Sequence, residues 1–214
     1  ALAIYPVAVE RGWLGADAAI ARTLAALRFF RDSPQGEQAD ATGHRGFYYH
    51  FLDFDSGRRA WQCELSTVDS AFLFAGMLSA ARYFADDSPA QREIRELAEA
   101  LYARAEWPWL QSERGTLRHG WHPESGFIPY CWEGFDEALL LYVLALGATQ
   151  HPLPPEAYAA WAASYEWKHA YGVDYLYCGP LFTHQLSHAW IDFRGLQDAF
   201  MRSKGIDYFE NSRR

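Results

Sequence analysis

The stretch STVDSAFLFAGMLSAARYF, residues 66–84, decides the fold class of this chain. Ser66 or Thr67 can cap the start of a helix, and apolar residues then occupy nearly every face of that helix. A helix that is apolar on all sides must be surrounded by other parts of the protein. The stretch therefore predicts a buried inner helix.

The next stretch, SPAQREIRELAEALYA at residues 88–103, predicts a helix of a different kind. Ser88 and Pro89 form a typical helix start. Ile94, Leu97 and Leu101 lie on one stripe, and charged residues cover the opposite face. This pattern is typical of an outer helix that packs on one side and faces water on the other.

The same alternation recurs further along the chain. Residues 137–146 predict a second apolar helix, and Pro154 and Pro155 start a shorter amphipathic helix that extends through Trp161 and Tyr165. Loops from inner to outer helices are short, whereas the returns, such as residues 107–134, are long. These features predict an all-α, partial (α/α)6 toroid of inner and outer helix pairs, with a cleft where the long returns gather.

Two further segments complete the expected structure. Residues 17–30 have a helical apolar period, with Asp17 as the expected cap. Residues 47–52 favour a strand, residues 55–57 a turn, and residues 61–64 the returning strand. We therefore expect small β-hairpin insertions between the helices.

Length, charge and cysteine spacing limit the classes of protein to consider. A chain of 214 residues can form one domain with a substantial core, so residues 1–214 are taken as a single domain. A net charge of -8 disfavours nucleic acid as a partner. No apolar run approaches the ~20 residues of a membrane span. Cys63, Cys131 and Cys178 show no metal or disulfide spacing, so we expect free, at least partly buried thiols.

The aromatic content, 17% of residues, is the most informative feature of the composition. Tryptophan and tyrosine rings can stack on the apolar faces of sugar rings while their N–H and O–H groups reach hydroxyls. An aromatic-rich helical core is the structural alternative. A neutral carbohydrate ligand fits the acidic charge and the aromatic content together.

Acids, aromatic residues and histidines crowd the long returns and the starts of the inner helices. The crowd consists of Asp53, Asp55, Trp61, Glu64, Asp69, Trp107, Trp109, His119, Trp121, His122, Trp132, Glu133, Asp136 and Glu137. Glycoside hydrolysis needs two carboxyl groups across the scissile bond. Asp69 and Glu137 are the candidates because each is expected in the first turns of an inner helix. Ordinary charges that stabilise a helix start are the alternative interpretation.

A second polar cluster lies at residues 180–195. His184 and His188 are four residues apart, and Asp192 continues the row, so a helix would place all three on one face. Hydrogen bonding to sugar hydroxyls is the preferred interpretation; histidines satisfied in a core and a metal site are the alternatives. Residues 207–214 form a further acidic and aromatic group that is expected to open another inner helix. The motifs of nucleotide-binding loops and of serine hydrolases are not found.

Six ordered blocks resemble the glycoamylase-like family, which is related to endo-β-1,2-glucanases and to the central domain of cyclic β-1,2-glucan synthases. The blocks are GFYYHFLDFDSGRRAW, ELSTVDSAFLFAGML, GFDEALLLYVLALG, HPLP, PLFTHQLSHAWIDFRG and GIDYFENSRR, which span about Gly46 to Arg214. This resemblance implies an (α/α)6 toroid that hydrolyses or transglycosylates glucans, with β-1,2-linked glucan as the expected partner. From the spacing of the candidate ligands we expect no metal, and we expect no cofactor.

The resemblance also implies roles for single residues. The family's block G-[YF]-[ND]-E-A matches residues 134–138, which makes Glu137 the general acid. The T-[VI]-D block matches residues 67–69, which gives Asp69 a sugar-binding or supporting catalytic role. The substrate-binding candidates are Trp61, Glu64, Trp121, Trp132, Asp136, His184, His188, Trp190, Asp192 and Glu210.

A complete toroid needs more helix pairs than this chain shows, so we expect a domain cut short at its C-terminus, with or without a cut at its N-terminus. An exposed apolar edge, or a second copy that covers it, is the expected consequence. The second catalytic acid would then lie outside the chain. A glucan-binding module without turnover and a structural part of a larger synthase are the other functional hypotheses. The substrate class favours a periplasmic or secreted location over a cytoplasmic one.

Overall fold

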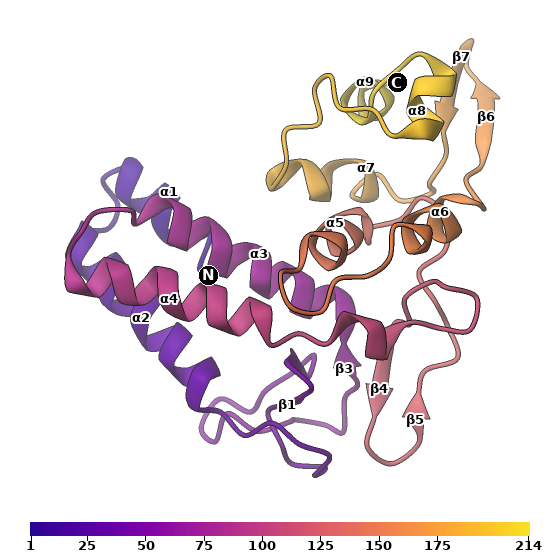
Figure 1. The fold of residues 1–214 in the computed structure, drawn as a ribbon. Coiled ribbons are helices and arrows are strands. Elements are labelled where there is room, and N and C mark those ends of the chain that lie inside the picture. The colour runs from indigo at the N-terminus through magenta and orange to yellow at the C-terminus, as the bar shows by residue number, and fades with distance from the viewer.

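The structure, a computed structural model, describes residues 1–214 as a predominantly helical fold with three small antiparallel sheets (Figure 1). The helices are α1 (Ile4–Glu10), α2 (Ala16–Asp32), α3 (Thr67–Tyr83), α4 (Pro89–Ala103), α5 (Leu139–Gly147), α6 (Glu156–Ala162), α7 (Thr183–Leu186), α8 (Ala199–Lys204) and α9 (Tyr208–Arg213), with 3₁₀ turns η1 (Trp107–Leu110) and η2 (Ser187–Ala189). The strands are β1 (Gly43–His44), β2 (Phe47–Tyr48), β3 (Leu65–Ser66), β4 (Gly120–His122), β5 (Gly126–Phe127), β6 (Trp167–Ala170) and β7 (Val173–Leu176). None of the helices has both the length and the apolar character of a membrane span.

Helix α3 is the buried inner helix that the sequence predicts. Ser66 caps it by accepting a hydrogen bond from the backbone N–H of Asp69. Phe74, Met77 and Ala80 are completely buried, and α3 packs against α1, α4 and α5. Because the helix is apolar all round, it forms the centre of a single hydrophobic core that extends into the C-terminal elements.

Helix α4 confirms the predicted amphipathic helix, which packs on one side and faces water on the other. Ser88 is its cap and Pro89 its first residue, and Ile94, Leu97 and Leu101 form its buried stripe. The charged side of α4 reaches α2, where Arg28 and Glu93 form a bidentate ion pair with N···O distances of 2.7 and 2.5 Å. This pair is partly exposed, so packing of the apolar stripe contributes more to stability than the pair does.

The long returns attach to the start of α3. Strand β3 pairs with β4, with Leu65 opposite Trp121, and β4 pairs with β5. The Trp132 indole N–H donates to the Thr67 hydroxyl over 2.9 Å, and that hydroxyl lies 2.9 Å from the carbonyl oxygen of His119. Three distant parts of the sequence therefore meet where α3 begins.

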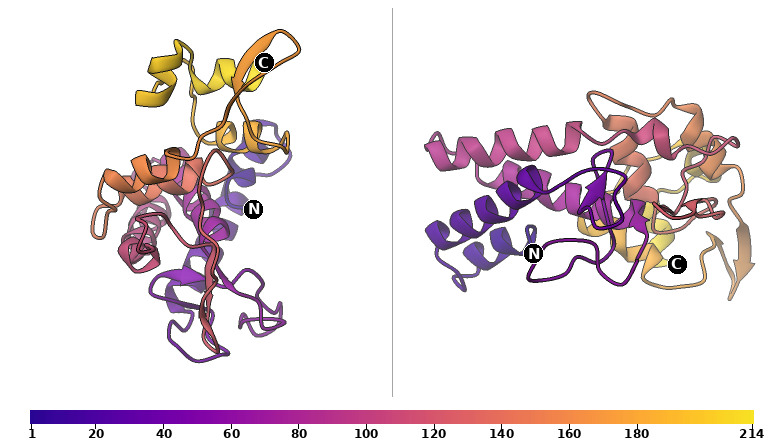
Figure 2. Two further views of the ribbon diagram at one scale, coloured as in Figure 1. Left: turned by 90° about the vertical axis from the view of Figure 1, so that its right-hand side faces the viewer. Right: turned by 90° about the horizontal axis from the view of Figure 1, so that it is seen from below.

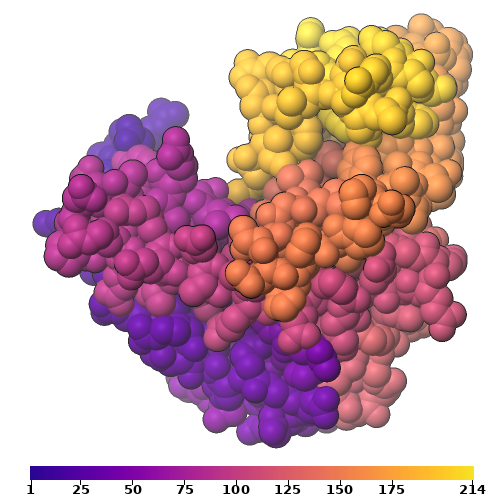
Figure 3. All heavy atoms as spheres, viewed as in Figure 1, coloured from indigo at the N-terminus to yellow at the C-terminus, as the bar shows by residue number.

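The elements after α6 form a C-terminal layer on the side of the molecule opposite the β1–β2 and β4–β5 loops (Figure 2). A cluster of hydroxyls joins this layer to α6: Tyr208 bonds to Tyr158 and Tyr165 over 3.0 and 2.9 Å and donates to Asp198 over 2.5 Å. Figure 3 shows a hollow that separates the C-terminal layer from the N-terminal helices.

Several sequence-based expectations about local structure are wrong. Asp17 does not cap α2 but lies within its first turn. The cap position is occupied by Gly15, which has no side chain that could accept a capping hydrogen bond. Helix α6 ends at Ala162, before Tyr165. The predicted strand at 47–52 keeps only Phe47–Tyr48, which pairs with β1. Its predicted partner at 61–64 is interrupted because Trp61 and Gln62 adopt left-handed backbone conformations, which no β-strand can include.

Apolar side chains remain exposed along several edges of the molecule. Helix α1 buries no residue, and its Ile4 and Val7 are 63% and 51% exposed. A cavity of about 440 Å³ opens between α2, α3 and the segment around Trp190, and eight of its nine lining residues are hydrophobic. These surfaces match the expected exposed apolar edge. The three cysteines are free and half-buried, as expected.

Candidate functional site

Asp69 lies in the first turn of α3, at the position that the apolar stretch predicts. The Ser66 hydroxyl, which caps the helix, also donates to Asp69 Oδ2 over 2.5 Å. The Asp69 side chain is 47% exposed, so its carboxylate is held in one orientation while it remains open to a ligand.

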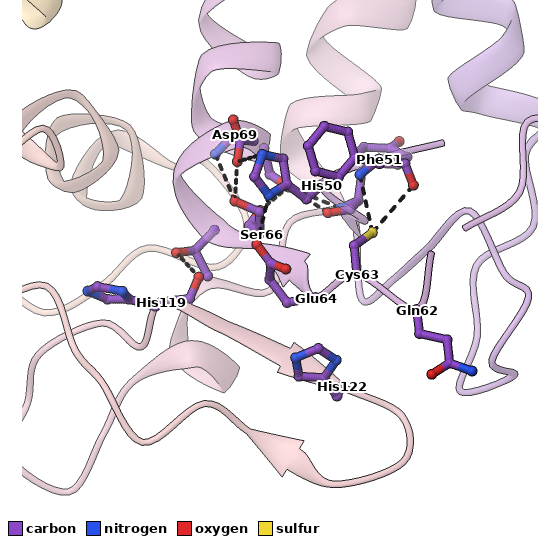
Figure 4. Close-up of polar contacts among 12 residues, drawn as sticks. His50, Phe51, Gln62, Cys63, Glu64, Ser66, Asp69, His119 and His122 are labelled. Carbon is purple, nitrogen blue, oxygen red and sulfur yellow. Dashed lines mark hydrogen bonds and ion pairs between the residues drawn. The ribbon is translucent and has the colours of Figure 1, made fainter. Parts of the chain in front are cut away.

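His50 connects Asp69 with Glu64, and sequence analysis did not identify it as a site residue. Its Nδ1 lies 2.8 Å from Glu64 Oε1, and its Nε2 lies 3.5 Å from Asp69 Oδ2. Figure 4 shows the imidazole between the two carboxylates, beside the ring of Phe51. The available signal was weak: a single histidine within an aromatic run, far in sequence from Asp69.

A small cavity adjoins this trio. It has a volume of about 180 Å³, and its lining includes Tyr48, Tyr49, His50 and Asp69. Aromatic rings therefore line this cavity together with the polar side chains of His50, Asp69 and Ser70.

Glu137 is half-buried. Burial raises the pKa of Glu137 above its usual value, and the negative charge of Asp69 raises it further. The two carboxyl groups are therefore close enough to interact electrostatically. A carboxyl group that retains its proton can act as a general acid.

The sequence predicts Glu137 in the first turn of α5. In the structure it precedes the helix. The helix begins at Leu139, because the Asp136 carboxylate accepts the backbone N–H of Ala138 over 2.9 Å and holds residues 136–138 in a turn. The Trp161 indole donates to the same oxygen over 3.2 Å. Burial is the main cause that raises the pKa of Asp136 to about 7.

The tryptophans of the long returns differ in their exposure. Trp107 is wholly buried and belongs to the core, so its place in the expected aromatic cleft is wrong. Trp132 stacks on His119 with ring centroids 3.9 Å apart, and burial lowers the pKa of that histidine. Trp121 stacks on His44 with centroids 5.0 Å apart. Trp61 is 83% exposed and lies beside Phe51.

The candidates near the C-terminus do not form the expected row. Helix α7 ends at Leu186 and continues as a 3₁₀ turn, in which residues four apart no longer align. His184 contacts the carbonyl oxygen of Cys178 at 3.1 Å, and His188 contacts the Ser212 hydroxyl at 3.0 Å. The three residues therefore do not share one helix face.

The acids of this segment pair with arginines. Asp192 accepts two hydrogen bonds from the Arg194 guanidinium, which lowers the pKa of Asp192 to about 2. Glu210 lies 3.5 Å from Arg213 and 3.6 Å from Arg214. Trp190 packs near Phe72 of α3 with ring centroids 6.4 Å apart, and it thereby links this segment to the helix that carries Asp69.

The structure thus brings Asp69 and Glu64 together through His50 and places Glu137 within electrostatic range of Asp69. Trp132 lies at the start of α3, next to this group. No cluster of three or more histidine, cysteine, aspartate or glutamate side chains has a geometry that could hold a metal ion.

Comparison with known proteins gives a consistent set of matches. The family model "Glycoamylase: Putative glucoamylase" matches residues 129–214. The exo-β-1,2-glucooligosaccharide sophorohydrolase (non-reducing end) of Parabacteroides distasonis is 24% identical over 239 aligned positions, which cover 96% of this chain and 31% of the relative.

Two solved structures have the same fold as this chain. The β-1,2-glucanase of Parabacteroides distasonis matches with a TM-score of 0.84 at 22% identity, over 99% of this chain and 33% of that one. The endo-β-1,2-glucanase of Chitinophaga pinensis, in complex with sophorotriose and glucose, matches with a TM-score of 0.81 at 23% identity, over 99% of this chain and 51% of that one. The chain therefore spans about half or less of the length of these relatives.

Proposed function

We propose, from its confirmed resemblance to the glycoamylase-like family, that this chain is part of an enzyme that cleaves glucosidic bonds of a β-1,2-linked glucan. The observation that carries the proposal is the environment of Glu137. This carboxyl is half-buried, has a raised pKa and lies within electrostatic range of Asp69. The relatives are named as a β-1,2-glucooligosaccharide sophorohydrolase and a β-1,2-glucanase, and these names support a β-1,2-linked glucan as the substrate.

The proposed reaction assigns one role to each of the two carboxyl groups. Protonated Glu137 donates its proton to the glycosidic oxygen as the bond between that oxygen and the anomeric carbon breaks. The anomeric carbon then receives the oxygen of water in hydrolysis, or the hydroxyl oxygen of a second sugar in transglycosylation, and the proton that this water or hydroxyl loses restores the protonated form of Glu137. Asp69, oriented by Ser66, binds the sugar beside the reacting bond. Its charge also helps Glu137 to keep its proton.

The same proposal extends to the architecture. We infer that α3 and α5 are inner helices and α4 and α6 outer helices of one (α/α)6 toroid, of which residues 1–214 form part of a single domain. The apolar cavity between α2, α3 and Trp190 is then a surface on which further helices of the toroid pack. The relatives, which are two to three times longer than the aligned part, support this reading.

Glu137→Gln tests the catalytic assignment. The substitution keeps the size of the side chain but removes the acidic proton, so release of reducing sugar from β-1,2-glucan should fall by roughly 100-fold or more. The midpoint of thermal unfolding should stay within about 1–2 °C, because a site residue contributes little to the core. Glu133→Gln, an exposed acid in the same loop, is the matched control and should keep full activity. Full activity of Glu137→Gln would refute the assignment.

A binding module without turnover is the second candidate function. The observation that favours it is the short coverage of the relatives, since a site completed by other residues could bind sugar here without cleaving it. Calorimetry with β-1,2-linked oligosaccharides and a product assay on the same sample separate the two. Binding together with product supports the enzyme, whereas binding without product supports the module.

A further inference from the structure

An exposed row of rings leads away from Asp69. The His50 imidazole, which contacts Asp69, stacks on Phe51 with centroids 4.1 Å apart and planes inclined by 13°. The Trp61 ring follows, with its centroid 5.2 Å from that of Phe51. Phe51 is 45% exposed and Trp61 is 83% exposed. The row therefore begins at the candidate site and continues outward along an open surface.

The backbone under Trp61 is strained. Trp61 and Gln62 have φ angles of 52° and 53°, and neither is a glycine. In this conformation the side chain of a residue other than glycine clashes with its own backbone, which destabilises the turn. An indole that is left in water recovers none of this cost through burial. Stability of the fold alone thus gives no reason for presenting Trp61 in this way, and strain of this kind is concentrated at functional sites.

Arg59 fixes the strained turn from beneath. Its side chain is only 1% exposed and donates to the carbonyl oxygens of Gln62 and Cys63 over 2.7 and 2.6 Å. Glu124 holds the guanidinium from the β4–β5 loop over 2.7 Å, and the Tyr49 ring lies beneath it, 4.8 Å from the ring centroid. Glu124 and Tyr49 therefore fix the guanidinium that in turn holds the carbonyl groups after Trp61, so Trp61 has a defined position.

We propose that Phe51 and Trp61 form a stacking platform for an outer glucose unit of the glucan whose cleaved bond lies between Asp69 and Glu137. This inference rests on the proposed function and names a subsite of it. The faces of a glucose ring that carry C–H groups match the exposed ring faces. The row of rings starts beside Asp69 and extends outward. A disaccharide bound between Asp69 and Glu137 therefore does not reach Trp61, but a longer oligosaccharide does. Arg59 is a positioning residue for the platform.

Affinity as a function of chain length tests the platform. Binding of β-1,2-linked glucose disaccharide and pentasaccharide is measured by calorimetry in a Glu137→Gln background, which prevents turnover. Trp61→Ala should weaken pentasaccharide binding about 3- to 10-fold, the effect of one lost stacking contact, and leave disaccharide binding unchanged. Trp61→Tyr, which keeps an aromatic ring, should restore most of the affinity. Trp13→Ala, which removes a comparably exposed indole between α1 and α2, is the control and should change neither affinity.

Arg59→Gln extends the test to the positioning residue. It should reproduce the selective loss for the pentasaccharide, with disaccharide binding retained as the sign of a folded site. Equal pentasaccharide affinities of Trp61→Ala and its parent would overturn the platform while leaving the proposed function intact. Absence of binding of either sugar to the parent would overturn both, and full activity of Glu137→Gln would overturn the proposed function by a separate assay.

Discussion

At the scale of single residues, three carboxyl groups in one region have three different environments. Asp69 is open and oriented by a hydroxyl, Glu137 is half-buried beside that charge, and Asp136 is enclosed by Trp161 and a backbone amide. The environment, and not the residue type, decides which of them keeps a proton near neutral pH. Asp136 therefore supports the turn that presents Glu137, although it was grouped with the substrate-binding candidates.

Asp136 makes the stability of the fold depend on pH. Because burial raises its pKa to about 7, the folded chain holds this proton more tightly than the unfolded chain does. The free energy of unfolding should therefore fall as pH rises from about 4 to about 7, and then level off. Asp136→Asn keeps the acceptor oxygen without this titration, so it should gain roughly 1–3 kcal/mol relative to the parent between pH 5 and pH 8. Urea unfolding at both pH values measures the difference.

Asp192→Asn serves as the control, because the pKa of Asp192 is shifted in the opposite direction to that of Asp136. Arg194 lowers the pKa of Asp192 to about 2, so both the folded and the unfolded chain have lost this proton by pH 5. Its difference from the parent should be the same at pH 5 and pH 8. A pH-independent difference for Asp136→Asn as well would show that Asp136 is ionised in the folded protein.

Some residues of the candidate site can be predicted from the sequence, and others cannot. The pattern at residues 66–69 places Asp69 correctly, because a cap and an apolar run are local signals. His50 was missed because its importance depends on the approach of Glu64 and Asp69, which long-range folding alone produces. The apolar run and the resemblance to the family both make Glu137 a candidate, but the turn that Asp136 imposes on it is not visible in the helical period.

At the scale of elements, α3 combines the centre of the core with a wall of the candidate site. Its cap, Ser66, bonds both the backbone N–H and the carboxylate of Asp69. Helix α4 has a similar cap, Ser88, which accepts the N–H of Gln91 far from any candidate acid. The two serines therefore offer a matched comparison between a cap that only stabilises and a cap that also orients a site residue.

Ser66→Ala and Ser88→Ala should each lower the free energy of unfolding by about 1 kcal/mol, the usual cost of a lost cap. Only Ser66→Ala should also weaken binding of β-1,2-linked disaccharide, because Asp69 then loses the hydroxyl that orients it. Chemical unfolding and calorimetry on both variants measure the two effects. Equal sugar affinities for the two variants would contradict the orienting role of Ser66.

Elements also differ in how well the sequence predicted them. Helices α3 and α4 were located from their caps and stripes, because these signals are local and strong. The short strands were misplaced, since pairing partners such as Leu65 and Trp121 are far apart in the chain. The row at residues 184–192 failed for another reason: its spacing assumed a continuous α-helix, whereas the chain changes to a 3₁₀ turn after Leu186.

At the scale of the whole molecule, the hydroxyl cluster around Tyr208 connects α6 with the C-terminal helices. Tyr208 makes bonds to Tyr158, Tyr165 and Asp198, and burial raises the pKa of its hydroxyl above the usual value. These hydrogen bonds are partly buried, and a bond of this kind contributes roughly 0.5–1.5 kcal/mol to stability. The cluster therefore carries much of the attachment of the C-terminal layer.

Tyr208→Phe should lower the free energy of unfolding by roughly 1–3 kcal/mol, because it leaves the buried partners without their shared hydroxyl. Amide hydrogen exchange should accelerate in residues 198–214, while α3 keeps its protection. Tyr171→Phe removes a fully exposed hydroxyl from the β6–β7 turn and is the matched control. Unchanged exchange at the C-terminal helices would show that apolar packing alone holds them.

The hydroxyl cluster has a consequence for how the C-terminal layer comes loose. Its four polar groups bond to one another in one partly buried site, so a water molecule that reaches one bond competes for the others as well. The hydrogen bonds of this cluster should therefore form and break cooperatively, with few intermediate states. When they break, α8 and α9 leave together as one unit instead of fraying residue by residue.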